Sequence, residues 1–137
     1  MYIDAIVVGQ SASFERVVTQ EVITSFADAS GDHNPVHIDP AFAAGTMFKG
    51  TIAHGMLSAA YISAVLGTQL PGPGAIYMSQ SLKFRAPVRP GDKVITTCTV
   101  REIVPEKKRV ILDTLCKVGD TVVLEGEATM LVQPKAK

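Results

Sequence analysis

The sequence has no tryptophan, only two cysteines, no excess of charge of either sign and no long apolar run. Its 13 basic and 13 acidic residues cancel, so no basic surface is expected that would attract nucleic acid or an anionic membrane. The most apolar segment, Met56 to Leu66, has eleven residues, well short of the roughly 20 that span a bilayer. We therefore expect neither a nucleic-acid partner nor a membrane partner.

The first residues, MYIDAIVVGQ, lack the basic start and the apolar core of a signal peptide. A cytoplasmic protein is therefore expected. Cys98 and Cys116 each fall inside a strand-like run with no metal-ligating neighbour at useful spacing. In a reducing compartment we expect two buried free thiols and no disulfide or zinc site.

What the chain does contain is enough apolar side chain for one core. It has 137 residues, of which 47% are hydrophobic and 19% are charged, and this predicts a single domain over residues 1–137. The mean hydropathy of +0.24 is high for a small domain. This value indicates that some apolar surface is buried against another chain.

The first half of the chain reads mostly as helix. A short strand is predicted over Ser13 to Val18, followed by a helix that Thr19 caps and that ends at Gly31. The segment DHNPVHIDP is predicted to be irregular until Asp39 and the proline after it begin a short helix. Gly55 to Leu66 is apolar nearly all round, which predicts a helix buried on all sides.

The second half alternates with a period of two, as strands do. One alternating run follows the turn PGPG, and Gln80, the one polar residue on its apolar face, is expected to be a buried, hydrogen-bonded amide. Further strands are predicted over about 93–104, 109–118 and 122–132, with Gly119 and Asp120 forming a two-residue hairpin loop. An antiparallel sheet wrapped around the apolar helix satisfies both halves, so the predicted fold class is α+β.

The titratable side chains gather in the irregular segment. All three histidines fall within 22 residues, together with two aspartates and an asparagine: His33, His37, His54, Asp32, Asp39 and Asn34. Histidine carries protons near neutral pH. Asp32, five residues before His37, is placed to share the proton of a water or substrate with it. Gly55 opens the apolar helix, where free backbone N–H groups stabilise an oxyanion.

These residues carry a family resemblance. Ser30 to Pro40 reads SGDHNPVHIDP, which resembles the motif G-D-x-N-P-aliphatic-H-x-D/E-P of the MaoC-like, R-specific enoyl-CoA hydratases, with every specified position filled. Ile52 to Met56 and the segment IYMSQSLKFRAPVRPGD resemble the regions that follow in that family. The resemblance runs from about Thr19 to the end of the chain. It implies a hot-dog fold, two copies paired as a homodimer, and reversible hydration of trans-2-enoyl-CoA to (R)-3-hydroxyacyl-CoA.

The resemblance also implies roles for individual residues. Asp32 and His37 are expected to hold the attacking water, and Gly55 to supply the oxyanion donor. Asn34 is expected to order the loop and to touch substrate. Ser63 and His54 are weaker candidates for contact with substrate. His54 is read first as a structural residue that fixes the helix entrance through a hydrogen bond. His33 fills the variable position of the motif and is expected to be an exposed loop residue.

No cofactor is expected beyond the coenzyme A that the substrate carries. A metal site built from Asp32, His37, Asp39 and His54 is disfavoured, because Asp39 serves better as a helix cap and an oxyanion hole replaces a Lewis acid. Three alternatives stay open. They are a dehydratase of the same fold that acts on a carrier-protein thioester or another hydroxyacyl-CoA, a hot-dog thioesterase, and a non-catalytic acyl-CoA-binding module.

Overall fold

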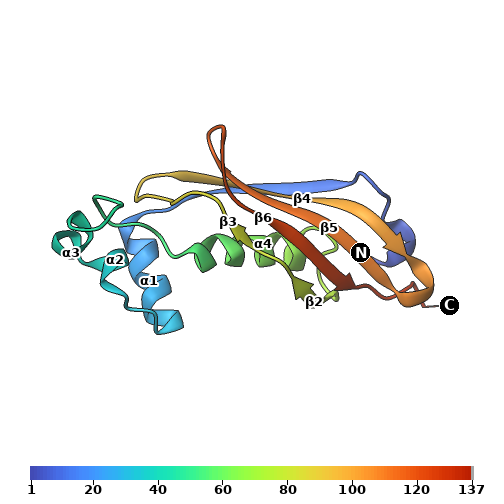
Figure 1. Cartoon of the computed structure of the whole chain (residues 1–137). Helices are drawn as coiled ribbons and strands as arrows, with labels where there is room; N and C mark the ends of the chain where they lie inside the picture. The colour runs from blue at the N-terminus through green and yellow to red at the C-terminus, as the bar shows by residue number, and fades with distance from the viewer. Residues whose placement is uncertain (137) are drawn as a thin grey trace.

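The computed structural model describes residues 1–136 and shows a six-stranded antiparallel sheet curved around one long helix, α4 (Figure 1). The strands follow the order β1-β4-β5-β6-β2, and β3 also pairs with β6. The helices are α1 (Gln20–Ser30), α2 (Pro35–Ile38), α3 (Pro40–Ala44) and α4 (Gly55–Thr68), with 3₁₀ turns at Ile3–Ala5 and Pro105–Lys107. The strands are β1 (Ser11–Val17), β2 (Ile76–Gln80), β3 (Lys83–Phe84), β4 (Lys93–Val104), β5 (Arg109–Val118) and β6 (Thr121–Leu131). The predicted α+β architecture is confirmed.

Helix α1 has the two ends that its sequence predicts. The Thr19 hydroxyl accepts a hydrogen bond from the Val22 N–H at 3.1 Å, which satisfies one of the free donors of the first turn. At the other end Gly31 takes a left-handed conformation with φ of 82°, which costs glycine little because it has no Cβ. Gly31 turns the chain directly into the segment that holds Asp32.

The alternating run after PGPG is not one strand but two. A bulge lies between Tyr77 and Ser79, and the chain leaves regular pairing at Ser81 before β3 begins. Gly126 of β6 makes room for this junction, since a Cβ there would lie 1.8 Å from the Ser81 carbonyl oxygen. Gln80 forms the predicted amide hydrogen bonds, to Thr114 Oγ1 at 2.9 Å and to the Ser81 carbonyl at 2.8 Å, although it is only half-buried.

The core lies between the concave face of the sheet and one side of α4. Ile62, Val65 and Leu66 of α4 are completely buried. Both cysteines face this core as free, buried thiols within the described chain, as predicted. Burial raises the pKa of the Cys98 thiol to about 12.

The prediction that α4 is buried on all sides is wrong for a single chain. The sheet covers only one side of the helix, and Met56, Ala60 and Ser63 on the other side are exposed. Strand β2, at the edge of the sheet, adds exposed Ile76 and Met78 beside them. Helix α4 and β2 thus present one continuous apolar face to solvent.

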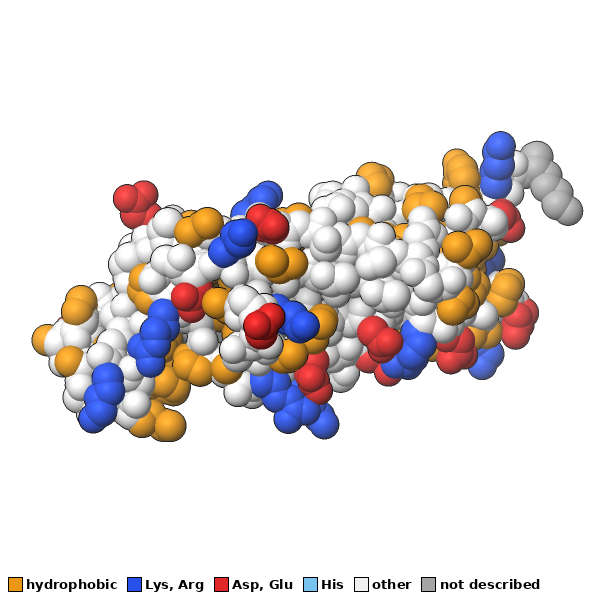
Figure 2. All heavy atoms as spheres, turned by 90° about the horizontal axis from the view of Figure 1, so that it is seen from above, with side chains coloured by type: hydrophobic (Ala, Val, Ile, Leu, Met, Phe, Trp, Pro, Cys, Tyr) orange, Lys and Arg blue, Asp and Glu red, His pale blue; other side chains and the backbone are white. Residues whose placement is uncertain are grey.

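The outer face of the sheet has a different character. Figure 2 shows acidic and basic side chains interspersed along it. Arg101 on β4, for example, pairs with Asp113 on β5 and Glu127 on β6, both at 2.7 Å. Among the helices of residues 1–136, none is long and apolar enough to cross a membrane.

Candidate active site

The predicted irregular segment contains a short helix, α2, which the sequence reading missed. The Asn34 side chain caps it by accepting a hydrogen bond from the Val36 N–H at 3.2 Å, as expected for a loop-ordering residue. Pro35 occupies the first helical position, where its fixed φ suits a helix and its missing N–H costs nothing. Asn34 and Pro35 therefore produce one helical turn, and this turn carries His37.

The side chains of Asp32, His37 and His54 lie close together at the N-terminal end of α4. One carboxylate oxygen and one ring nitrogen from each histidine lie within 4.8 Å of one another. Asp32 is exposed, whereas the two imidazoles are 8% and 3% exposed. The site thus combines one solvent-exposed carboxylate with two buried histidine side chains.

The hydrogen bonds of His37 define which ring nitrogen is free. Nδ1 lies 2.8 Å from the Ile52 carbonyl oxygen. Because a carbonyl oxygen only accepts, Nδ1 carries the hydrogen, and Nε2 of the neutral ring has a lone pair. The backbone of His37 is held as well, since Gln20 Nε2 donates to its carbonyl at 2.9 Å. His37 is therefore a positioned proton acceptor.

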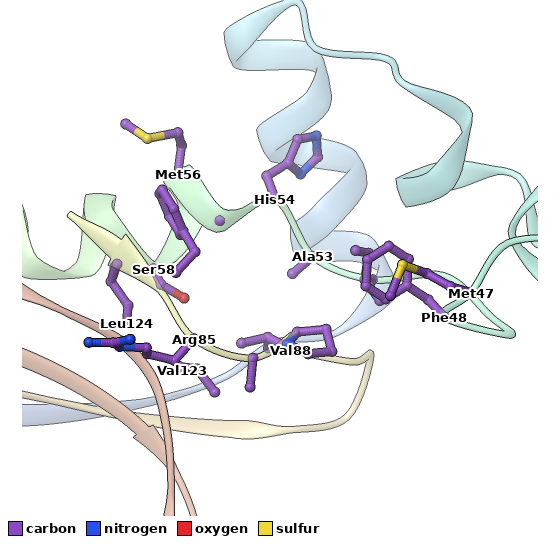
Figure 3. Close-up of a pocket in the computed structure, with 15 residues that line it drawn as sticks. Met47, Phe48, Ala53, His54, Met56, Ser58, Arg85, Val88, Val123 and Leu124 are labelled. Atoms are coloured by element: carbon purple, nitrogen blue, oxygen red, sulfur yellow. The ribbon is translucent and has the colours of Figure 1, made fainter.

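His54 lies directly before α4 and forms the predicted hydrogen bond at the helix entrance. Its Nε2 donates to the backbone carbonyl of Asp32 at 2.9 Å. Its ring stacks on that of His37, with 3.7 Å between centroids and 27° between planes. The rings of Phe26 and His54 form an edge-type contact with 4.9 Å between centroids. In Figure 3 the His54 ring points away from Ser58 and Val88 on the pocket wall.

Gly55 begins α4, and because it has no side chain a neighbouring aromatic ring lies close to its backbone. A Cβ at this position would lie 2.6 Å from two ring atoms of Phe84, so the close approach of this ring requires glycine. Gly55, His54 and Phe84 line a pocket of about 600 Å³ (Figure 3), whose walls are mostly apolar. The N-terminus of a 14-residue helix thus opens into a mostly apolar hollow.

Ser63 does not lie beside this group. It is exposed on α4, eight residues or about 12 Å of helix beyond Gly55. It lines a second hollow of about 590 Å³ together with Tyr77 and Gln80. Met56 lines both hollows and separates them.

The geometry of the three clustered groups does not suit a metal ion. The lone pairs of imidazole lie in the ring plane, and two rings stacked 27° from parallel do not direct them at one point between the rings. The fourth residue considered, Asp39, is used elsewhere, because its carboxylate accepts from the N–H groups of Ala41 and Phe42 at 3.1 and 3.2 Å and caps α3. The arrangement favours proton transfer.

The remaining histidine, His33, points into solvent, in agreement with its place at the variable position of the motif. It pairs with Asp28 at 2.9 Å, and this hydrogen bond raises the pKa of the His33 ring. Sequence reasoning missed Phe26, Gln20 and Phe84. None of them belongs to the motif, and nothing in their local sequence signals contact with it.

A family model described as a MaoC like domain matches residues 5–126. The chain belongs to this family, and its fold is the hot-dog fold of the solved relatives.

Individual proteins of this family are similar to the chain over most of its length. The chain is 56% identical to a protein of Rhodospirillum rubrum named (R)-specific enoyl-CoA hydratase, over 96% of this chain and 91% of that protein. It is 47% identical to a 3-hydroxybutyryl-CoA dehydratase of Methylorubrum extorquens, over 98% and 86% of the two chains. A solved (R)-hydratase of A. caviae involved in PHA biosynthesis superposes with a TM-score of 0.90 at 40% identity, covering 93% of this chain and 98% of that one.

Proposed function

We propose that this protein is an (R)-specific enoyl-CoA hydratase, a hydro-lyase that reversibly adds water to a trans-2-enoyl-CoA. The observation that carries the proposal is the group formed by Asp32, His37 and the N-terminus of α4 at Gly55. The names of the R. rubrum and A. caviae relatives support the same activity.

Hydration needs a group that takes a proton from water, one that gives a proton to C2, and a donor for the thioester oxygen. A water with two hydrogen bonds of about 2.8 Å bridges acceptors as far apart as those of Asp32 and His37. As its oxygen bonds to C3, one of its protons passes to the Asp32–His37 pair, and the pair delivers a proton to C2 on the same face. The negative charge gathers on the thioester oxygen, where the Gly55 N–H stabilises it.

Crotonyl-CoA is the direct test, followed by the loss of enoyl absorbance. Asp32→Asn and His37→Gln each keep a polar side chain but remove one of the two groups that can exchange a proton with the water, so kcat is expected to fall by about 10²–10⁴-fold, the usual range for a general acid or base. His33→Gln is the matched control, because it changes a histidine of the same motif that points into solvent. Normal turnover in both site variants would contradict the proposal, and release of free CoA would indicate a thioesterase.

The apolar face formed by α4 and β2 supports a homodimer. Met78 and Ile76 are 48% and 54% exposed on an edge strand whose outer side has no partner strand within residues 1–136. A second copy laid against this face would cover both residues and the exposed side of α4. Met78→Lys is expected to shift the protein to a monomer by light scattering, whereas Val7→Lys, at a residue 62% exposed elsewhere, leaves the assembly intact. A wild-type monomer that is fully active would contradict the dimer.

The product, biosynthetic context and compartment complete the proposal. Conversion of the product by an (R)-specific rather than an (S)-specific 3-hydroxyacyl-CoA dehydrogenase tests its configuration. The name of the A. caviae structure supports supply of polyhydroxyalkanoate precursors. The two buried free thiols fit a reducing cytoplasm.

A further inference from the structure

His54 contacts all three groups that take part in the proposed hydration: Asp32, His37 and the start of α4 at Gly55. It is the residue directly before Gly55, its Nε2 bonds the backbone of Asp32, and its ring face covers that of His37. These three parts come from separate segments: the loop after α1, the helix α2, and the start of α4. His54 is thus one side chain that joins them all.

The hydrogen bond from His54 restrains the carboxylate of Asp32 through its backbone. The Asp32 N–H donates to Ser30 Oγ at 3.1 Å, and one carboxylate oxygen of Asp32 accepts from the Asn34 N–H at 3.2 Å. The carbonyl of Asp32, held by His54, is the remaining backbone group of this residue. Losing the bond to His54 would free this peptide group of an exposed loop to rotate, and the carboxylate with it.

The stacked ring restrains His37 in a second way. Nδ1 of His37 is bonded to the Ile52 carbonyl, so the ring can still tilt about that bond unless its face is covered. The ring of His54 covers one face at 3.7 Å, and Phe26 supports His54 from behind. The Nε2 lone pair of His37 is thereby kept pointing in one direction.

The second ring nitrogen of His54 adds no hydrogen bond to the fold of residues 1–136. Nδ1 is buried and has no hydrogen-bond partner among residues 1–136. A buried acceptor without a partner destabilises a fold. An apolar ring of similar size would avoid this loss, yet it could not donate to Asp32.

We propose that His54 is a positioning residue of the hydratase site: its Nε2–H fixes the backbone of Asp32 while its ring face fixes the imidazole of His37. The proposal rests on the proposed function for its kinetic consequence, although the geometry of the His37 ring can be tested without any substrate.

Two substitutions separate the two contacts. His54→Phe keeps a ring against His37 and removes the donor, whereas His54→Gln keeps an amide donor near the position of Nε2 and removes the aromatic face. With crotonyl-CoA, kcat of His54→Phe is expected to fall about 10–100-fold with little change in KM, because small displacements of reacting groups have effects of this size. His54→Gln is expected to recover a substantial part of kcat.

Thr96→Val is the matched control, because it removes one buried side-chain hydrogen bond, to Cys116, in which neither His37 nor His54 takes part. The thermal midpoint of His54→Phe is expected to fall no further than that of Thr96→Val, although its kcat falls much further. Three outcomes would overturn the proposal: wild-type kcat in both His54 variants, a rise in KM with kcat unchanged, or a loss of kcat that follows the loss of stability and is not rescued by glutamine.

Nitrogen NMR of His37 separates this proposal from the proposed function. In the wild type, Nδ1 of His37 is expected to give the signal of a protonated nitrogen and Nε2 that of a free one. In His54→Gln the line of Nε2 is expected to shift or broaden, because this variant removes the aromatic face that covers the His37 ring. An unchanged His37 spectrum would overturn the positioning role even in an active enzyme. Absence of hydration by the wild type would instead refute the function alone.

Discussion

Gly126→Ala tests the junction between β2 and β3 with a magnitude that follows from the structure. The added Cβ would lie 1.8 Å from the carbonyl oxygen of Ser81 and 2.8 Å from its carbonyl carbon. Both atoms belong to the backbone and cannot swing aside. The chain at Ser81 must therefore withdraw by more than 1 Å before the contact reaches even 3.0 Å, below which real Cβ atoms are essentially never found.

That withdrawal breaks the contacts between the junction and β6. The Ser81 N–H donates to the Glu127 carbonyl at 2.9 Å, and the Glu127 N–H donates to Ser81 Oγ at 3.0 Å. Each bond contributes about 1 kcal/mol, and overpacking adds about 1–3 kcal/mol. The lower chain entropy of alanine offsets about 0.5–1 kcal/mol. We expect the free energy of unfolding to fall by about 2–4 kcal/mol.

Urea unfolding at one fixed protein concentration measures this change, since the stability of the proposed dimer would depend on concentration. Gly45→Ala is the matched control, because its Cβ would meet the Phe42 carbonyl oxygen at an ordinary 3.5 Å. A loss of less than about 1 kcal/mol for Gly126→Ala, or equal losses for the two variants, would refute the steric reasoning.

Three further changes test other parts of the molecule. Burial raises the pKa of the Cys98 thiol to about 12. This thiol is therefore expected to resist a thiol reagent at pH 8 in the native protein and to react once urea unfolds the chain. Rapid labelling of the native protein would contradict the burial of Cys98. Asp39→Ala removes both cap bonds of α3 and is expected to cost about 1 kcal/mol and to speed amide exchange there, so unchanged exchange would argue against the cap. Gly55→Ala is expected to displace the half-exposed ring of Phe84 and to lower crotonyl-CoA turnover about tenfold or more while the thermal midpoint changes little; unchanged turnover would remove Gly55 from the oxyanion site.

Local sequence predicted the parts of the fold that depend on neighbouring residues. Thr19 and Asp39 cap the helices that follow them, because a cap needs only N–H groups two or three residues away. Gly119 and Asp120 turn the chain between β5 and β6 for the same local reason. Two local predictions were wrong: α2 was missed, since a stretch of polar residues and prolines also suits a single capped turn, and the run after PGPG is two strands and not one.

Contacts between segments far apart in the chain could not be predicted from the sequence. His37 and His54 stack although they are 17 positions apart, and no pattern in the sequence shows that the loop between them returns to the same place. The exposed side of α4 was missed because an apolar composition predicts burial without showing which neighbouring element would provide it. The mean hydropathy pointed in the right direction at the outset, toward apolar surface beyond the needs of one core.

The caps in the segment from Gly31 to Pro40 have a consequence for how such motifs are interpreted. Asn34 and Asp39, each followed by a proline, build two short helices in succession. Asp32 and His37 supply the groups for chemistry, although one oxygen of Asp32 also orders the loop by accepting from the Asn34 N–H. The motif therefore encodes a shape and a reaction in largely different residues. A relative that keeps the Asn-Pro and Asp-Pro pairs but lacks the acid and the histidine would keep both helix caps and would have lost the hydration chemistry.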